Sequence, residues 1–307
     1  MDVKRVLTVA GSDSGGGAGI QADLKTITAL GGFGMSVVTA LTAQNTLGVQ
    51  AVHEIPVEFI EAQFDSVAGD IGVDAAKTGM LSSSEIIRCV AKKIRQYRIR
   101  KLVVDPVMAA KGGSRLLREE ARETLVRELI PLAAVVTPNI PEAEALAGMR
   151  IAGKRDMRKA AVRIHGLGAK NVVVKGGHLE GDAVDLLFDG RGFHEFAVTR
   201  IDTKHTHGTG CTFASALATG LAQGAGVPEA VKRAKDYVTE AIRFGLAIGG
   251  GQGPTNHFAP VFREGERWRC IEELKRAVTR LKSARTGNII PEIQSNFGYA
   301  LSGASSA

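Results

Sequence analysis

The chain has 307 residues, of which 44% are hydrophobic and 23% are charged, and its formal net charge is +7. This is the composition of an ordinary globular protein, and it favours neither a disordered chain nor a membrane protein. The three cysteines, Cys89, Cys211 and Cys270, are far apart and lack metal-ligand spacing, which favours a reducing compartment. Because the N-terminus also lacks the pattern of a signal peptide, we expect a cytoplasmic protein.

Much of the positive charge lies near the C-terminus. Between Arg263 and Arg285 there are eight Lys or Arg and four Asp or Glu, which gives +4 of the total. A basic stretch of this kind is usually a solvated helix face, and no aromatic-interleaved RNA-binding signature accompanies it. We therefore do not expect nucleic acid as a partner, and no apolar run predicts a membrane span.

Short β-branched runs alternate with longer amphipathic segments along the chain. The expected strands are 6–10, 36–42, 102–105, 135–137 and 171–175. The expected helices are 20–30, 84–96, 119–130, 156–165 and 228–244. The strands are continuously apolar and end in polar residues, as in parallel sheets that are buried on both faces. The pattern predicts an α/β fold with a mostly parallel central sheet, helices on both faces, and a ligand at the carboxyl ends of the strands.

Two further features complete the predicted organisation. Residues 185–188 and 193–198 flank Asp189-Gly190, which indicates an antiparallel hairpin. From about Lys282 the pattern resembles a linker, so we expect one domain over 1–282 and a linker or partial second domain over 283–307.

The first glycine-rich segment, residues 11–19, lies between an expected strand and helix. It matches neither the spacing of a dinucleotide fingerprint nor that of a Walker A loop. Its position, with Asp23 one turn into the next helix, predicts a loop where the backbone approaches a ligand closely.

The second glycine-rich segment is Gly208-Thr209-Gly210-Cys211, which follows an expected strand over 198–203 and opens a helix of small residues. Unpaired N–H groups at such a helix start converge on one point and form an anion site. We expect the helix start to lower the pKa of Cys211, which would then accept the proton of a substrate hydroxyl. His205 and His207 lack a third ligand of matching spacing, so zinc is not expected.

Several polar residues lie at or just beyond the ends of apolar strands. Asp105, Asn139 and Glu142 are candidates for a Mg²⁺–phosphate site, because Mg²⁺ prefers oxygen ligands. Lys175 closes another strand, and its ammonium is expected to stabilise a transferring phosphoryl group. Each of these residues alone also suits a helix cap or a surface position.

Together these segments closely resemble the hydroxymethylpyrimidine/phosphomethylpyrimidine kinases of thiamine biosynthesis, a branch of the ribokinase superfamily. The resemblance covers about residues 3 to 260 and rests on motifs that recur in order: 10–23, Gln44-Asn45, 77–81, 105–108, 137–139, Glu142, 175–178 and 206–211. It implies a ribokinase-like fold, a homodimer, and two successive ATP-dependent phosphorylations of 4-amino-5-hydroxymethyl-2-methylpyrimidine.

The resemblance also implies roles for individual residues. Gln44 would hold the aminopyrimidine, because a carboxamide offers one donor and one acceptor. The other implied residues line the substrate pocket (Gly11, Asp23, Met80, Val107), serve Mg²⁺ and ATP (Asp105, Asn139, Glu142, Thr206) or act on the phosphoryl group (Lys175, Gly208, Gly210, Cys211). Cys211 stands where most ribokinase relatives carry an aspartate base, which leaves the proton acceptor open.

Two other functions remain as alternatives. A pyridoxal or pyridoxine kinase would act on a similar hydroxymethyl group, and a sensor would bind the pyrimidine without catalysis. Residues 289–296 resemble the start of the thiamine-phosphate synthase domain that archaeal versions of this kinase carry.

Overall fold

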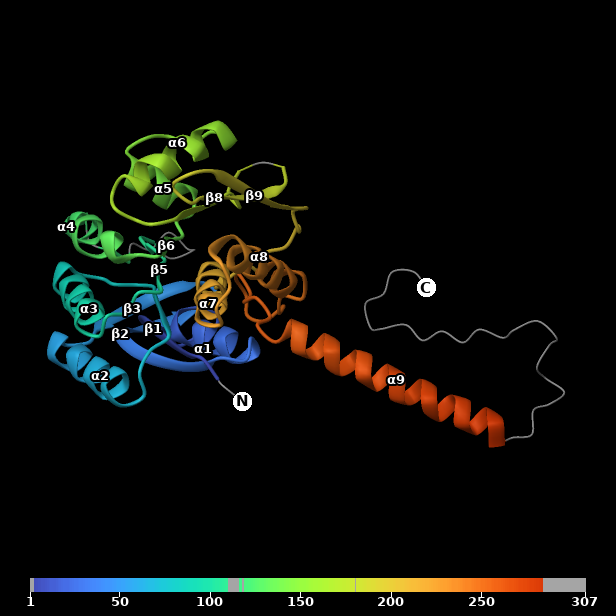
Figure 1. Ribbon diagram of the computed structural model, residues 1–307. Helices are drawn as coiled ribbons and strands as arrows, with labels where there is room; N and C mark the ends of the chain where they lie inside the picture. Colours follow the sequence, from blue (N-terminus) through green and yellow to red (C-terminus); the bar gives the residue numbers. More distant parts are fainter. Residues whose placement is uncertain (1–2, 110–115, 118, 180, 284–307) are drawn as a thin grey trace. The chain divides into compact units, whose positions relative to one another are not determined.

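The computed structural model describes residues 3–109, 116–117, 119–179 and 181–283. The chain divides into two compact units, Met1–His257 and Phe258–Ala307, and each is described by itself. The described part of the second unit is one helix, α9 (Ala259–Ser283), whereas the first unit holds the sheet (Figure 1). Among the described helices, none combines the length and the hydrophobicity that a membrane span requires.

A nine-stranded sheet forms the centre of the first unit, in the order β3-β2-β1-β4-β5-β6-β7-β8-β9. The six strands from β2 to β7 in this order are parallel, and β3, β8 and β9 are added antiparallel at the two edges. The strands are β1 (Arg5–Asp13), β2 (Phe33–Asn45), β3 (Gly48–Glu54), β4 (Ala75–Thr78), β5 (Leu102–Val104), β6 (Val135–Val136), β7 (Val172–Lys175), β8 (Ala183–Phe188) and β9 (Phe193–Val198).

Helices cover both faces of this sheet. One face is covered by α1 (Gly19–Ala29), α7 (Thr209–Ala222) and α8 (Val227–Arg243), which lie together in Figure 1. The helices of the other face are α2 (Val57–Asp70), α3 (Ser84–Gln96), α4 (Glu119–Thr124), η1 (Leu125–Leu129), η2 (Ile130–Leu132), α5 (Ile140–Ala147) and α6 (Lys154–His165).

The alternation of side chains along each parallel strand explains the two layers. Leu102 and Val104 belong to the core under α2 to α6, whereas Val103 between them belongs to the core under α1, α7 and α8, and all three are fully buried. A strand that is buried on both faces must be apolar at every position. The predicted α/β fold with a mostly parallel sheet is therefore confirmed.

The expected hairpin is present, but some elements differ from the expectation. The predicted helix 119–130 continues from α4 into a π-helical turn and a 3₁₀ turn. β4 was not predicted, because Lys77 interrupts its apolar pattern although all four of its residues are buried. α2 was also missed, because it buries only Ile60 and Phe64 and its apolar stripe is narrow.

The strand expected over 198–203 does not form, since β9 ends at Val198. The guanidinium of Arg200 donates to the carbonyls of Gly177, Leu179 and Gly181. These side-chain hydrogen bonds, rather than backbone pairing with a neighbouring strand, hold this segment to the loop after β7.

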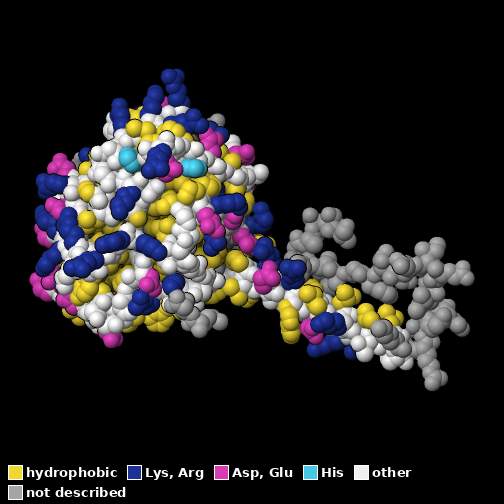
Figure 2. Space-filling model, in the orientation of Figure 1, with side chains coloured by type: hydrophobic (Ala, Val, Ile, Leu, Met, Phe, Trp, Pro, Cys, Tyr) yellow, Lys and Arg dark blue, Asp and Glu magenta, His cyan; other side chains and the backbone are white. Residues whose placement is uncertain are grey.

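The first unit ends at His257, before the domain boundary predicted at 282. The residues from 284 onward, which include the predicted linker and the segment that resembles a synthase domain, lie outside the described residues. Figure 2 shows Lys and Arg side chains distributed over the visible face of the first unit, with hydrophobic side chains between them.

Candidate active site

A cavity of about 390 Å³ lies at the carboxyl ends of the parallel strands, where the first turn of α7 meets the loops after β1, β5 and β7. Open α/β sheets bind their ligands at this edge. Twelve of the thirteen predicted site residues line it: Gly11, Gln44, Met80, Asp105, Val107, Asn139, Glu142, Lys175, Thr206, Gly208, Gly210 and Cys211. The geometry thus brings together residues that are far apart in the sequence.

Asp23, the thirteenth residue, is not among those that line the cavity. Its fully buried carboxylate accepts hydrogen bonds from Thr8 Oγ1 (2.6 Å) and Ser215 Oγ (2.7 Å), and it forms an ion pair with Lys77 Nζ (2.9 Å). Burial would lower the pKa of Lys77, but the acidic groups around it, first of all the Asp23 carboxylate and then Cys211 and Asp105, together raise that pKa. The assignment of Asp23 to the substrate pocket is thus corrected: its side chain ties α1 to β1, β4 and α7 in the interior.

Lys175 and Asp105 form an ion pair in the cavity. Lys175 Nζ lies 2.8 Å from Asp105 Oδ1, which also accepts from Thr137 Oγ1 at 3.0 Å. Asp105 Oδ2 has no hydrogen-bond partner among the described residues and faces Gly210, where a Cβ atom would lie 3.4 Å away. Burial would lower the pKa of Lys175, but the carboxylates of Asp105 and Glu142 raise it, so the side chain stays an ammonium.

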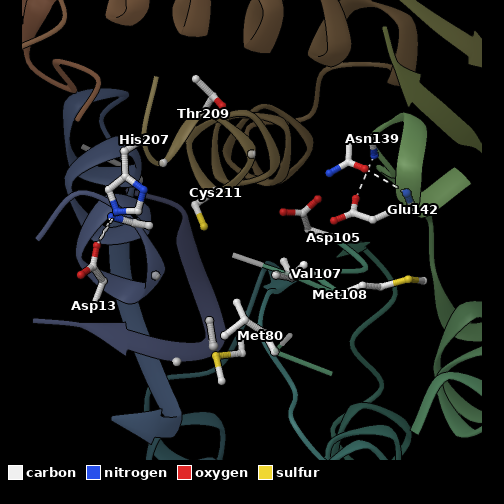
Figure 3. A pocket seen from close by; sticks show the side chains of 18 of the residues that line it. Asp13, Met80, Asp105, Val107, Met108, Asn139, Glu142, His207, Thr209 and Cys211 are labelled. Atoms are coloured by element: carbon white, nitrogen blue, oxygen red, sulfur yellow. Dashed lines mark hydrogen bonds and ion pairs between the residues drawn. The ribbon is translucent and has the colours of Figure 1, made fainter. Parts of the chain in front are cut away.

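Glu142 has two roles at the start of α5. It forms a capping box, in which Asn139 N donates to Glu142 Oε2 (2.8 Å) and Glu142 N donates to Asn139 Oδ1 (2.9 Å). It also lines the cavity beside Asp105 (Figure 3). Burial raises the pKa of Glu142 to about 7, with Asp105 adding to the rise and Lys175 opposing it.

The N-terminus of α7 lies at the position predicted for the anion site. Gly208 is its N-cap, with φ of 85°, and a Cβ atom there would lie 1.8 Å from the carbonyl oxygen of Gly17. Only glycine allows both this backbone conformation and this approach. The first glycine-rich loop and the second one are therefore in direct contact, and Thr209, Gly210 and Cys211 of the first turn of α7 line the cavity.

The expectation for Cys211 is corrected. Its side chain points into the cavity (Figure 3), but burial raises the pKa of the thiol to about 11 and outweighs the opposing charge of Lys77. The helix start, on which the prediction of a lowered pKa rested, is too small an effect to reverse the loss of hydration. Cys211 is therefore a neutral thiol at neutral pH.

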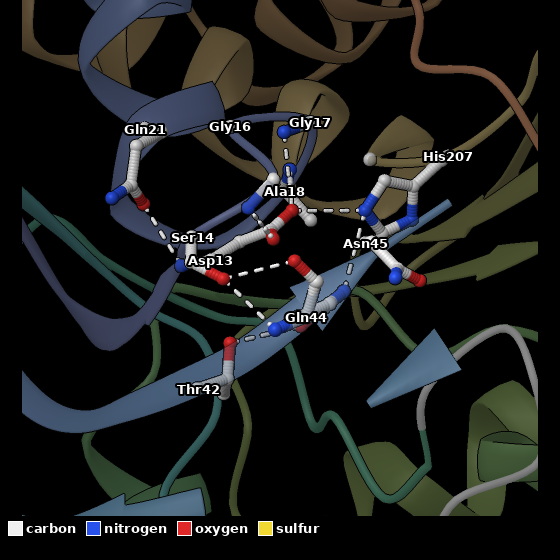
Figure 4. Close-up of polar contacts among 12 residues, drawn as sticks. Asp13, Ser14, Gly16, Gly17, Ala18, Gln21, Thr42, Gln44, Asn45 and His207 are labelled. Atoms are coloured by element: carbon white, nitrogen blue, oxygen red, sulfur yellow. Dashed lines mark hydrogen bonds and ion pairs between the residues drawn. The ribbon is translucent and has the colours of Figure 1, made fainter. Parts of the chain in front are cut away.

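Asp13 and His207 are functional candidates that the sequence did not reveal. Asp13 Oδ2 accepts from the N–H groups of Gly17 (3.1 Å) and Ala18 (2.8 Å) and from His207 Nε2 (2.9 Å) (Figure 4). Burial opposes ionisation of Asp13, but the bonds from His207 and the backbone keep its pKa below the usual value. His207 Nε2 also lies 3.3 Å from Gln44 Nε2. The Ser-Asp-Ser-Gly pattern, typical of an aspartate that binds the amides of its own loop, was the available signal.

A second cavity of about 420 Å³ adjoins the first. Its lining includes the apolar side chains of Phe213, Val238 and Ile242 from α7 and α8. The residues that line both cavities are Asn139, Lys175, His178, Thr206, Thr209 and Gly210. Two ligands can therefore meet at Lys175 and the first turn of α7.

The sequence of this chain matches a family model described as phosphomethylpyrimidine kinase over residues 13–256. The chain belongs to the phosphomethylpyrimidine kinase family. This confirms the family predicted from the motifs, and the match ends one residue before the end of the first compact unit.

Curated relatives support the family. The chain is 52% identical to the hydroxymethylpyrimidine/phosphomethylpyrimidine kinase of Bacillus subtilis, with 84% of this chain and 96% of the relative covered. It is 60% identical over 253 residues to the thiamine biosynthesis bifunctional protein of Geobacter sulfurreducens, where the match covers 82% of this chain and 52% of the relative. The chain thus spans about half the length of this bifunctional relative and nearly all of the shorter one.

Solved structures agree with the fold. The phosphomethylpyrimidine kinase of Clostridium difficile is 48% identical, with a TM-score of 0.70 over 78% of this chain and 99% of the other. The pyridoxal kinase of Bacillus subtilis, solved as an ADP complex, is 43% identical, with a TM-score of 0.79 over 84% of this chain and 98% of the other. The predicted ribokinase-like architecture is confirmed.

Proposed function

We propose that the chain transfers a phosphoryl group from ATP to the hydroxymethyl oxygen of 4-amino-5-hydroxymethyl-2-methylpyrimidine, and a second one to the monophosphate that results. The observation that carries this proposal is the pair of adjoining cavities that share Lys175 and Gly210. A pyrimidine in the first cavity and ATP in the second would present the acceptor oxygen and the γ-phosphate to each other at that junction. The names of the relatives given above support the choice of substrate.

The first cavity suits an aminopyrimidine. Gln44 supplies a donor and an acceptor for an amino group beside a ring nitrogen. Met80 and Val107 offer apolar contacts to the ring, and Gly11 leaves room for it, because a Cβ atom there would lie 3.1 Å from Met80 Sδ. We assign these residues to substrate binding.

The junction suits phosphoryl transfer, whose transition state needs position and charge more than covalent help. The ammonium of Lys175 and the backbone N–H groups from Gly208 to Gly210 would face the transferring group and neutralise its charge. Asn139 and Thr206 line both cavities and would contact the phosphates of ATP.

The carboxylates of Asp105 and Glu142 fit Mg²⁺. Both line the first cavity, and Asp105 Oδ2 has no partner among the described residues. In the described part of the chain, no group of three or more His, Cys, Asp or Glu side chains could hold a metal. Two protein carboxylates are enough for Mg²⁺, because its other ligands are usually waters and the phosphates of the substrate. Mg²⁺ would neutralise part of the charge of those phosphates.

Cys211 lines the first cavity and is the residue predicted to take the proton of the substrate hydroxyl. As a neutral thiol it is a poor base at rest, so we assign most of the rate acceleration to Lys175 and the α7 N-terminus. A thiol that already carries its proton has no site for a second one, so the hydroxyl proton passes to another acceptor, such as an oxygen of the transferred phosphate.

The activity is tested by incubating the chain with Mg²⁺, ATP and the pyrimidine alcohol or its monophosphate, and following ADP and the phosphorylated products. We expect the monophosphate first and then the diphosphate. Absence of ATP turnover with both pyrimidines would refute the proposal, and binding of the pyrimidine without turnover would indicate a sensor.

Pyridoxal kinase activity is the second candidate, because solved relatives that are 43% and 38% identical are named pyridoxal kinases. The ratio of kcat/KM for the pyrimidine alcohol and for pyridoxal distinguishes the two functions. We expect the ratio to favour the pyrimidine.

The homodimer and the cytoplasmic location also remain proposals. Leu41 and Val52 on the edge pair β2–β3 are exposed, at 47% and 44%, which suits contact with a second copy. Light scattering coupled to size-exclusion chromatography measures the assembly directly.

A further inference from the structure

His207 occupies a position that constrains its hydrogen atoms. The carboxylate of Asp13 can only accept, so the 2.9 Å contact with His207 Nε2 requires a hydrogen on that nitrogen. His207 is consequently a donor at Nε2. Any second group close to the same nitrogen must be an acceptor.

Gln44 presents the wrong atom to this donor. Its Nε2 atom lies 3.3 Å from His207 Nε2, so two N–H donors face each other. The other end of the carboxamide has the opposite conflict, in which two acceptors compete for one hydrogen. Thr42 Oγ1 lies 3.1 Å from Gln44 Oε1 and 2.9 Å from the Ser12 carbonyl oxygen, and when its single hydrogen goes to the closer Ser12 oxygen, two oxygens without a hydrogen between them face each other at Gln44.

A half-turn of the carboxamide resolves both conflicts at once. Oε1 then accepts from His207 Nε2, which shares its hydrogen between Asp13 and Gln44. Nε2 then donates to Thr42 Oγ1, whose hydrogen stays with Ser12. In this arrangement His207 takes up one lone pair of Oε1, and Thr42 takes up one N–H group of Nε2. The other lone pair and the other N–H group then face the cavity.

We propose that His207 is a positioning residue that orients the Gln44 carboxamide and thereby selects an aminopyrimidine over a pyridine. The inference rests on the proposed function, since it concerns the ring that Gln44 binds. In the orientation that His207 imposes on the Gln44 carboxamide, the amide oxygen lies on the His207 side and accepts from the amino group of the ring. The amide N–H lies on the Thr42 side and donates to the neighbouring ring nitrogen.

A pyridoxal or pyridoxine ring carries no amino group beside its nitrogen. It therefore leaves at least one of the two amide groups unpaired, which costs binding free energy in a partly buried site. A carboxamide that could turn freely would adapt to either ring. Discrimination thus depends on the orientation of Gln44 as well as on its presence.

The surroundings of His207 make this orientation rigid. A Cβ atom on Gly17 would lie 2.5 Å from His207 Cδ2 and 2.9 Å from Pro254 Cβ, so the first glycine-rich loop packs closely against the imidazole. The backbone of His207 is held on the other side, where its N–H donates to the Gly253 carbonyl and its carbonyl accepts from Thr255 N, each at 3.1 Å. The ring has little freedom to leave Asp13.

The test compares His207→Leu and His207→Gln with the unaltered chain, using steady-state kinetics with the pyrimidine alcohol and with pyridoxine. Leucine removes the donor, and we expect KM for the pyrimidine to rise about tenfold, the worth of roughly one hydrogen bond. The preference for pyrimidine over pyridoxine in kcat/KM should fall by a similar factor, while KM for ATP stays within about twofold. Glutamine restores a donor near the Nε2 position and should recover most of the loss.

His194→Leu is the matched control. His194 forms a similar pair with Asp189 at 3.0 Å on the β8–β9 hairpin. Its loss should leave KM for the pyrimidine, KM for ATP and the preference for pyrimidine over pyridoxine unchanged. A merely structural role of His207 would instead raise KM for ATP and pyrimidine together and would not be rescued by glutamine. That pattern would overturn the proposal.

A double-mutant cycle with Gln44→Ala tests the route of the effect. If His207 acts through Gln44, then His207→Leu does not raise KM for the pyrimidine any further in the Gln44→Ala background. A KM in the double variant that rises by the product of the two single-variant factors would overturn the proposal. In a crystal of the unaltered chain with the pyrimidine, we expect the ring amino group on the His207 side of Gln44, and the reverse placement would also overturn it. Failure of the proposed function appears separately, as absence of pyrimidine phosphorylation by the unaltered chain.

Discussion

The ammonium of Lys175 lies 2.8 Å from Oδ1 of Asp105, at the point where the two cavities meet. The pair holds a positive charge where a phosphoryl group would pass between two ligands. It also keeps that charge in place before any ligand binds, so little reorganisation is needed at the moment of transfer.

Replacing this ammonium tests its role in catalysis. For Lys175→Met we expect kcat to fall by about 10²- to 10³-fold, as when one stabilising group of a transition state is removed. KM for the pyrimidine should change by less than about threefold, because the ring is proposed to bind at Gln44 rather than at Lys175. Lys92→Met, which removes an exposed surface pair with Glu61, is the control and should leave kcat unchanged. An unaltered kcat for Lys175→Met would remove Lys175 from the mechanism.

The thiol of Cys211 should react slowly at neutral pH. With its pKa at about 11, little thiolate exists at pH 7.5. Iodoacetamide labelling of Cys211, followed by peptide mass spectrometry, is expected to rise about tenfold per pH unit from pH 8 to 10, since the thiolate is the reactive form. The Cys211→Ser variant identifies the labelled peptide. A labelling rate that levels off below pH 9 would show an activated thiolate instead.

The raised pKa of Glu142 predicts a pH-dependent stability. In the unfolded chain the pKa of this group is near its usual value of 4.5, and in the folded protein it is about 7. The folded state therefore binds the proton more tightly, and the stability from this group is lost as pH rises from about 4.5 to 7. Glu142→Gln keeps an acceptor for the capping box and removes the charge, so it should raise the free energy of unfolding at pH 8 by about 1–3 kcal/mol. Urea titrations at pH 5 and pH 8 measure this, and an equal effect at both pH values would contradict it.

Gly208 should tolerate no side chain. Gly208→Ala combines a positive φ of 85° with a Cβ atom only 1.8 Å from Gly17 O. Gly148 has a φ of 61° at the end of α5 and nothing within 4 Å of its Cβ position, so Gly148→Ala isolates the backbone cost of about 1–2 kcal/mol. We expect Gly208→Ala to cost more than this control and to abolish pyrimidine phosphorylation, because the two glycine-rich loops must separate. Equal thermal stability of the two variants would contradict the close contact.

Asp23→Asn should act on stability first. The carboxylate neutralises Lys77 in a fully buried site, and an uncompensated buried charge costs about 3–5 kcal/mol. The double variant Asp23→Leu/Lys77→Met removes both charges and should be more stable than Asp23→Asn. Denaturant unfolding measures the free energy of unfolding of each variant. A rise in KM for the pyrimidine in Asp23→Asn with unchanged stability would support the original assignment of Asp23 to substrate binding.

The sequence predicted the elements that depend on local pattern. α3 has the predicted bounds, from Ser84 to Gln96, because it carries a Ser83 N-cap and a regular apolar stripe. The β8–β9 hairpin was found from its Asp-Gly turn, where Asp189 Oδ1 accepts from the N–H groups of Arg191 and Gly192. These signals lie within a few residues of each other.

Features that depend on distant partners were not predictable in the same way. Asp23 and Lys77 are 54 residues apart, and nothing in either segment shows that one charge neutralises the other in the core. The pKa of Cys211 was predicted in the wrong direction, because a helix start is visible in a sequence and the loss of hydration is not. Twelve of the predicted site residues, identified by the family motifs, line the first cavity, and their roles remain proposals.

Asp13 and His207 are separated by 194 residues, yet they meet at 2.9 Å. During synthesis Asp13 leaves the ribosome early and must wait for nearly the whole first unit to be translated before its partner exists. At about 5–20 residues per second this interval is on the order of 10–40 s. If the chain binds a pyrimidine at Gln44 as proposed, any rescue of a destabilised variant by added ligand that depends on this contact must occur after translation has passed His207.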